Sequence, residues 1–147
     1  MLLPSQVQIF IIDGILALQD EVAIGGQLNV EVKVKNIGNI YSSSSYIGYY
    51  LSADTLLDIS DQYLGEDYVS GLYGGGYSNE FIEYYVYDVD TGKYYLLVVA
   101  DHENHIDELN EDNNMAFVPI TVKYPEIDLL ISSTSINDTL LPLPAKT

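Results

Sequence analysis

The stretch QLNVEVKVKNIG, residues 27–38, alternates apolar and polar side chains along its length. The apolar positions share one face of an extended chain, at Leu28, Val30, Val32 and Val34. The polar positions, which include both lysines and Glu31, fall on the other face. A period of two indicates a β-strand with one face buried and the other in water, and such strands are most common in antiparallel sheets. The stretch therefore predicts a half-buried antiparallel strand.

Six further segments complete a set of strands. The same alternation recurs in GKYYLLVVAD (92–101) and in MAFVPITVK (115–123), where Pro119 falls on the outward register and suits an edge or a bulge. The other strand candidates are residues 7–18, 44–53, 62–70 and 78–87. Gly- and Asn-rich turn signals separate these runs, and no long helical stripe interrupts them. About seven short strands predict an all-β fold, an Ig-like antiparallel β-sandwich.

The segment DTGKYYL, residues 90–96, sharpens this prediction. It fits the corner that opens strand F of Ig-like sandwiches, where a Tyr hydroxyl bonds to the backbone upstream. Here Tyr94 is the corner residue, and Leu96 takes the core position two places later. The alternative is that Tyr94 simply packs against its neighbours.

Composition and charge exclude several classes of partner. The chain has 147 residues and a formal net charge of −17, with five Lys, no Arg and no Cys. A surface without a basic face cannot bind nucleic acid or an anionic membrane surface. It suits a medium rich in salt or divalent cations. No segment reaches the roughly 18 apolar residues of a membrane span. The N-terminal stretch lacks the basic region of a signal peptide, so an export signal is expected outside this chain.

The two ends of the chain resemble each other. PSQVQIFIIDGIL (4–16) aligns with PEIDLLISSTSI (125–136), with a proline before matching aliphatic positions in both. A repeat of domain length suggests tandem modules. We therefore predict one sandwich domain over residues 4–124, followed by the first strand of a truncated next repeat, or a tail, over residues 125–147. Chance similarity between two Pro-preceded strands is the alternative.

Three carboxylates crowd one connection between strands, at Asp54, Asp58 and Asp61. Calcium takes six to eight oxygen ligands with tolerant geometry, whereas magnesium prefers to keep its waters. The gaps of four and three residues are not those of an EF-hand, but a hairpin loop can bring such side chains to one point. These residues are thus candidate calcium ligands. The alternative is that they cap turns by bonding the backbone two residues on.

A second acidic run, residues 101–112, connects the last two strands and contains His102 and His105. Asp and Asn side chains there are predicted to hold an irregular loop by local hydrogen bonds. The spacing of the two histidines is not that of a helical zinc motif, so we expect two exposed loop histidines. No phosphate-binding loop or nucleophile motif is present, and the chain is not predicted to be an enzyme.

Tyrosines are abundant, with 14 in the chain. The segments 78–87 and 92–101 are expected to be neighbouring strands, which makes Tyr85, Tyr87 and Tyr95 a candidate outward platform. Such a row could stack on sugar rings or on a protein partner. Ordinary cross-strand aromatic pairing is the alternative.

The chain resembles CARDB, the cell-adhesion-related domain of bacteria and archaea. The resemblance is carried by VKVKNIGN (32–39), SSYIGYYLSADTLLDISDQYLG (44–65), GKYYLLVVAD (92–101) and DELNEDNN (107–114). These blocks occur in order between residues 7 and 123. The resemblance implies an Ig-like sandwich, often in tandem, within large secreted or surface proteins and attached to other domains. It does not imply enzymatic activity.

These observations predict a non-catalytic structural or adhesion module of a secreted or cell-surface bacterial protein, stabilised by calcium. Its expected partners are neighbouring domains of the same polypeptide and a cell-surface protein or glycan. The alternative is a carbohydrate-binding accessory module of a secreted hydrolase.

Overall fold

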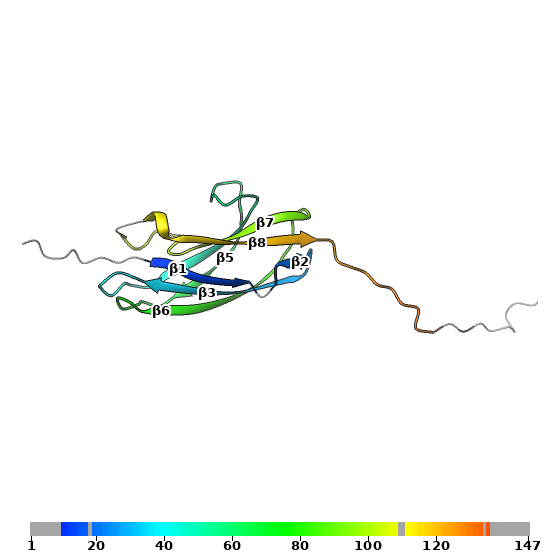
Figure 1. The fold of residues 1–147 in the computed structure, drawn as a ribbon, viewed down its shortest axis with the longest axis horizontal. Helices are drawn as coiled ribbons and strands as arrows, with labels where there is room; N and C mark the ends of the chain where they lie inside the picture. Colours follow the sequence, from blue (N-terminus) through cyan, green and yellow to red (C-terminus); the bar gives the residue numbers. More distant parts are fainter. Residues whose placement is uncertain (1–9, 18, 109–110, 134, 136–147) are drawn as a thin grey trace, which may run out of the picture.

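The computed structural model describes residues 10–17, 19–108, 111–133 and 135, and these residues form two packed sheets (Figure 1). The three-stranded sheet has the order β1 (Phe10–Ala17), β3 (Gln27–Asn36), β6 (Tyr77–Tyr85). The five-stranded sheet has the order β2 (Glu21–Ala23), β8 (Met115–Lys123), β7 (Gly92–Val99), β4 (Ser45–Ser52), β5 (Gln62–Val69). A short 3₁₀ turn, η1 (Glu111–Asn113), precedes β8. The predicted all-β sandwich is confirmed.

The described residues contain one strand more than the seven predicted. The additional strand, β2, has three residues and pairs in parallel with the end of β8. Three residues are too few to show a period of two, so the sequence pattern did not reveal it. Because β2 covers only residues 121–123 of β8, the exposed Pro119 lies beyond that pairing, and the edge-like position expected for it is confirmed.

The core forms where the alternating faces of the two sheets meet. In β3 the four predicted inward residues are 0–1% exposed, and in the other sheet Leu96 and Val98 are fully buried. Burying a Val or Leu side chain contributes about 1.5–3 kcal/mol relative to leaving it in water. The hydrophobic pattern of residues 27–38 therefore supplies four of the side chains through which the two sheets pack.

The tyrosine corner predicted at the start of β7 is confirmed. The Tyr94 hydroxyl donates a hydrogen bond of 2.8 Å to the backbone carbonyl of Asp90, four residues upstream. Leu96, two places later, is fully buried. The corner thus ties the loop before β7 to the strand that supplies the core.

Replacing Tyr94 with Phe is expected to lower the free energy of unfolding by about 1 kcal/mol, the net value of a typical hydrogen bond. The variant keeps the ring and loses only the hydroxyl group. Urea denaturation of the purified chain measures the effect. The matched control is Tyr95→Phe, since the ring of Tyr95 packs edge-on against Phe117 at 5.6 Å. Equal stability of the two variants would show that the corner bond contributes nothing.

The chain enters and leaves the sandwich at opposite ends. β2 runs parallel to β8, and Figure 1 shows β1 running in the same direction. Figure 1 shows the segment after β8 leading away from the end opposite the start of β1. Residues 124–133 form no strand and are exposed. The division at residues 4–124 and 125–147 stays a prediction, and residues 4–9 and 136–147 lie outside the described part of the chain.

Candidate metal centre

The loop between β4 and β5 contains the three predicted calcium ligands. The Asp54 carboxylate accepts a 2.8 Å hydrogen bond from the amide of Leu56. One oxygen of Asp58 accepts from both the amide and the hydroxyl of Ser60, at 2.7 and 2.5 Å. The Asp61 carboxylate accepts a 2.7 Å bond from the Asp58 amide. These bonds are the turn-capping arrangement that the sequence left open as the alternative.

The same three carboxylates do not form one compact group of ligand atoms. Among the described residues, one group of three His or carboxylate side chains has its ligand atoms within 4.8 Å of one another. That group contains none of these three aspartates. The two hydrogen bonds from Ser60 lower the pKa of Asp58, so this carboxylate is charged at neutral pH. Calcium binding by Asp54, Asp58 and Asp61 therefore stays a prediction.

The compact group consists of Glu66, His102 and Glu103. Their ligand atoms all lie within 4.8 Å of one another, and the His102 Nε2 atom is 2.7 Å from a Glu66 oxygen. The His102 side chain is 10% exposed, whereas the two glutamates are 36% and 38% exposed. The group thus has a buried imidazole with two carboxylates at the water boundary.

Gly48 makes room for the imidazole. It lies in the interior strand β4, opposite Glu66 of β5 on one side and Val99 of β7 on the other. A Cβ atom at this position would lie 2.5 Å from Cγ of His102, closer than real atoms approach. The ring of His102 therefore lies directly over Gly48 and reaches across β4 to the edge strand.

Two tyrosines hold the ring in this orientation. The Tyr50 hydroxyl is 3.1 Å from Nδ1 of His102, and the Tyr63 ring stacks on the imidazole at 5.9 Å and 22°. Burial raises the pKa of Tyr50, and the charge of Glu66 raises it further, so this hydroxyl stays protonated at neutral pH. The hydroxyl can donate to Nδ1, or accept from it when the imidazole has the other tautomer.

The loop that carries His102 is held by a buried aspartate. Asp101 is 3% exposed and has a positive φ of 47°. Its carboxylate accepts backbone hydrogen bonds from His105 at 3.1 Å and Ile106 at 2.8 Å. The predicted structural role of this acidic run in holding an irregular loop is thus confirmed for Asp101.

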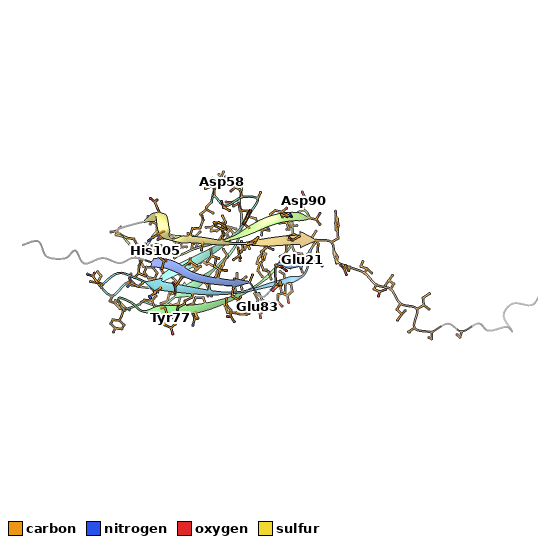
Figure 2. All side chains as sticks on the ribbon, viewed as in Figure 1. Glu21, Asp58, Tyr77, Glu83, Asp90 and His105 are labelled. Atoms are coloured by element: carbon orange, nitrogen blue, oxygen red, sulfur yellow. The ribbon has the colours of Figure 1, made fainter. Side chains whose placement is uncertain are left out.

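The expectation of two exposed loop histidines is wrong for His102 and confirmed for His105. The His105 side chain is 55% exposed and lies 3.1 Å from a Glu103 oxygen, at the end of the sandwich opposite Asp90 (Figure 2). The sequence did contain a signal for the buried ring. Gly48 stands inside an otherwise regular strand, and a glycine there often marks the close approach of another group.

The predicted tyrosine platform is not formed from neighbouring strands. β6 belongs to the three-stranded sheet and β7 to the five-stranded sheet, so Tyr95 does not lie beside Tyr85. The expectation is wrong because the chain crosses from one sheet to the other between β6 and β7, so these consecutive strands do not pair. Tyr85 and Tyr87 do lie together: each is 53% exposed, and their rings stack at 6.4 Å and 23°. Ligand binding by Tyr85 and Tyr87 stays a prediction.

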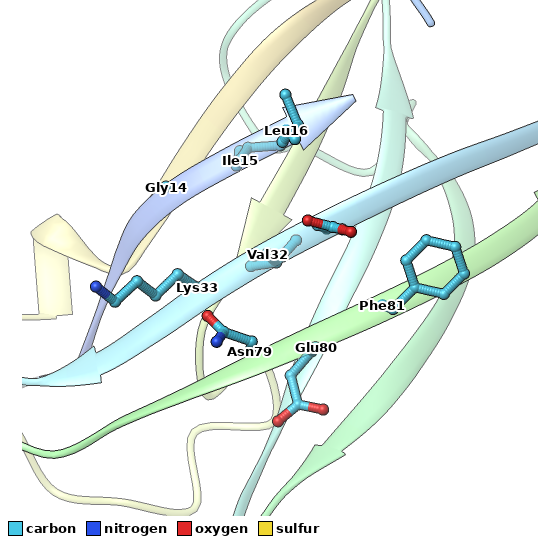
Figure 3. A pocket seen from close by; sticks show the side chains of 9 residues that line it. Gly14, Ile15, Leu16, Val32, Lys33, Asn79, Glu80 and Phe81 are labelled. Carbon is cyan, nitrogen blue, oxygen red and sulfur yellow. The ribbon is translucent and has the colours of Figure 1, made fainter. Parts of the chain in front are cut away.

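A hollow of about 580 Å³ crosses β1, β3 and β6 (Figure 3). Leu16 and Phe81 line it and are about half exposed. Two carboxylates also line it, Glu31 and Glu80. Glu31 pairs with Phe81 and points outward, whereas Glu80 pairs with the buried Val32 and shares its inward face. The two carboxylates therefore point to opposite faces of the sheet.

Glu80 is partly buried where β6 comes close to β5. Burial raises its pKa, the hydroxyl of Ser78 lowers it, and the charge of Asp67 raises it. A raised pKa means that the folded state holds this proton more tightly than the unfolded chain. The group therefore costs stability as pH rises above the ordinary glutamate value, and the cost is absent below it.

Replacing Glu80 with Gln is expected to raise the melting temperature at pH 7 by a few degrees, because the uncharged amide removes this cost. The gain should shrink when melting is measured below the ordinary glutamate pKa, where Glu80 is protonated in both states. Glu83→Gln, an exposed position on the same strand, is the control (Figure 2). A gain that is the same at both pH values would contradict this explanation.

The comparisons with known proteins agree with this architecture. The CARDB family pattern matches residues 10–117. No curated protein sequence matches the chain. In the described residues, no helix is long and apolar enough to cross a membrane.

Solved structures with the same fold are similar at low identity. A CARDB domain from Pyrococcus furiosus, solved in complex with di-metal ions, is 23% identical with a TM-score of 0.64, and covers 84% of this chain and 100% of its own. A domain of a cell surface protein from Methanosarcina acetivorans is 18% identical with a TM-score of 0.60, and the match covers 80% and 93%. A β-glucosidase from Listeria innocua is 19% identical with a TM-score of 0.56, but the match covers 80% of this chain and only 16% of the enzyme.

Proposed function

Because the chain belongs to the CARDB family, a cell-surface-associated class of module, we propose that it is a non-catalytic spacer or adhesion unit of a secreted or cell-surface protein. The observation that carries this proposal is the path of the chain. β1 begins at one end of the sandwich and β8 ends at the other, so further domains would be joined in series (Figure 1). The neighbouring domains of the same polypeptide are therefore its first partners.

The parallel pairing of β2 with the end of β8, where the chain leaves the sandwich, suits a domain that must resist pulling. When the two ends are pulled apart, β2 and β8 slide past each other, so their parallel contacts are loaded together rather than one by one. The Thr121 amide bonds the Asp20 carbonyl at 2.8 Å, and the Ile24 amide bonds the Lys123 carbonyl at 2.9 Å. An ion pair of 3.0 Å between Lys123 and Glu21 spans the same strands.

Single-molecule pulling of the chain between two folded handle domains tests the spacer proposal. We expect one cooperative unfolding event that releases roughly 35–40 nm of chain, since each extended residue spans at most about 3.6 Å. Thr121→Pro removes the amide that bonds Asp20 and should lower the unfolding force. Unfolding in several weak steps, or an unchanged force in the variant, would contradict the proposal.

The lack of a catalytic role is supported by the placement of the carboxylates. A glycosidase needs two of them facing one another across a substrate cleft. The two that line the hollow across β1, β3 and β6, Glu31 and Glu80, point to opposite faces of the sheet. The β-glucosidase match covers a small part of that enzyme, which fits an accessory module.

We also propose calcium as a stabilising ion at Asp54, Asp58 and Asp61, on the basis of their oxygen ligands and the chain's charge of −17. Calcium titrated into chelator-treated protein should raise the melting temperature, and the double variant Asp58→Asn, Asp61→Asn should lose that gain. An unchanged melting curve up to millimolar calcium would remove calcium from the proposal.

Glycan binding is the second candidate function, and one observation favours it. Exposed aromatic side chains follow the outer face along and just beyond β6, at Tyr77, Phe81, Tyr85 and Tyr87. Polysaccharide pull-down that is lost in Tyr85→Ala or Tyr87→Ala would support a carbohydrate-binding accessory module. Tyr68→Ala is the control, because Tyr68 is similarly exposed at 52% but lies on β5 of the other sheet. Absence of binding to any polysaccharide would leave the spacer proposal alone.

A further inference from the structure

We propose that Glu66, His102 and Glu103 form a binding site for a single divalent transition-metal ion, with zinc the best-fitting ion. This site is distinct from the calcium loop at residues 54–61 and does not depend on the spacer role. It joins the edge strand β5 to the loop that follows β7, across the interior strand β4.

The donor set selects the class of ion. An imidazole nitrogen with carboxylate oxygens suits zinc and its neighbours, whereas calcium takes oxygen ligands. Three protein ligands leave the fourth position of a tetrahedral zinc site for water. The two glutamates are each about one-third exposed, so an ion and its water can reach the site from solvent.

Zinc binding requires the ligand atoms to shift by about 1.4 Å or less, because none of them is more than 4.8 Å from another. The ligand atoms already lie within 4.8 Å of one another, and Nε2 of His102 is 2.7 Å from Glu66. Ligands of zinc at about 2.1 Å lie roughly 3.4 Å from one another in a tetrahedron. The imidazole and the carboxylate therefore need to separate by less than about 1 Å to admit the ion.

The surroundings of His102 are those of a prepared ligand rather than of a surface histidine. Its ring is nine-tenths buried, Gly48 leaves it space, and Tyr63 stacks on one face. The Tyr50 hydroxyl contacts Nδ1, the nitrogen that would not bind the ion. Metal-bound histidines almost always have such a partner on the other nitrogen, which fixes the ring orientation and the tautomer.

The tautomer can change without gain or loss of a proton by the site. When the neutral imidazole carries its proton on Nε2, Tyr50 donates to Nδ1 and the Nε2–H group donates to Glu66. With the ion on Nε2, the imidazole carries its proton on Nδ1, and the Tyr50 oxygen accepts it. Tyr50 is thus a positioning residue, and Glu66 exchanges a hydrogen bond for a metal bond.

Isothermal titration of chelator-treated protein with zinc chloride tests this site. We expect one ion per chain and a melting temperature that rises with zinc concentration. His102→Gln should abolish binding, and Glu66→Gln should weaken it at least tenfold. Tyr50→Phe should weaken it about 10- to 100-fold, as loss of a partner to a ligating histidine does.

Two variants are matched controls. His105→Gln removes the other, exposed histidine, which contacts Glu103 at 3.1 Å, and should weaken zinc binding far less than His102→Gln does. The double variant Asp58→Asn, Asp61→Asn should also keep zinc binding, which separates this site from the calcium loop. Urea denaturation without metal shows whether each variant is folded. Absence of saturable zinc binding by the wild-type chain, or zinc binding that survives unchanged in folded His102→Gln, would overturn the proposal.

Discussion

Replacing Leu96 with Ala is expected to lower the free energy of unfolding by about 2–5 kcal/mol. Leu96 is fully buried, and it stands at the centre of β7 on the face that packs against the other sheet. Removing its side chain loses the burial free energy and leaves a cavity that the two sheets cannot close without moving together. Urea denaturation gives the difference in stability directly.

Leu56→Ala is the matched control for this prediction. Leu56 lies in the loop between β4 and β5 and is 69% exposed. The same chemical change there should alter stability by less than about 0.5 kcal/mol. If both variants lose the same stability, the sheets do not pack through Leu96, and the sandwich core described above is incorrect.

Replacing Gly48 with Ala is expected to cost about 1–3 kcal/mol, the usual cost of overpacking. The new methyl group would lie 2.5 Å from Cγ and 2.8 Å from Cβ of His102. Because β4 pairs with β5 on one side and β7 on the other, the backbone at Gly48 is held, so the His102 side chain and the loop that carries it must move instead. The displaced ring should lose its contacts with Tyr50 and Glu66.

A double-mutant cycle tests whether the cost arises from His102. In the His102→Gly background both the ring and the Cβ atom that face residue 48 are removed, so Gly48→Ala should cost little there. The expected coupling is about 1–2 kcal/mol, within the range measured for residues in direct contact. Additive losses would mean that the ring does not lie over Gly48, and the proposed zinc site would lose its main support.

Much of the sandwich could be predicted from local patterns. The alternation in residues 27–38 assigned the buried face of β3 correctly, because side chains of a strand point alternately to its two faces. The corner at Tyr94 was also predictable, since its bond to Asp90 spans only four residues. The prediction failed where burial depends on neighbouring strands: Leu97 falls on the outward register of β7, yet it is fully buried.

The candidate site was not predictable in the same way. Glu66 and His102 are 36 residues apart, and they meet because β5 and β7 pair on either side of β4. The acidic loop at Asp58 was predicted to bind calcium because its carboxylates are close in sequence. Each of these carboxylates, however, accepts a hydrogen bond from within the loop. Closeness in the sequence therefore did not indicate which possible metal ligands lie together in the fold.

The amino-acid sequence by itself determined seven of the eight described strands, the buried face of β3 and the family to which the chain belongs, since a period-two pattern is a property of consecutive residues. Tertiary structure alone decided that β6 and β7 lie in different sheets and that His102 is buried over Gly48 beside Glu66. These relations depend on the order in which strands pair, because hydrogen bonding between strands brings together side chains that no local spacing relates.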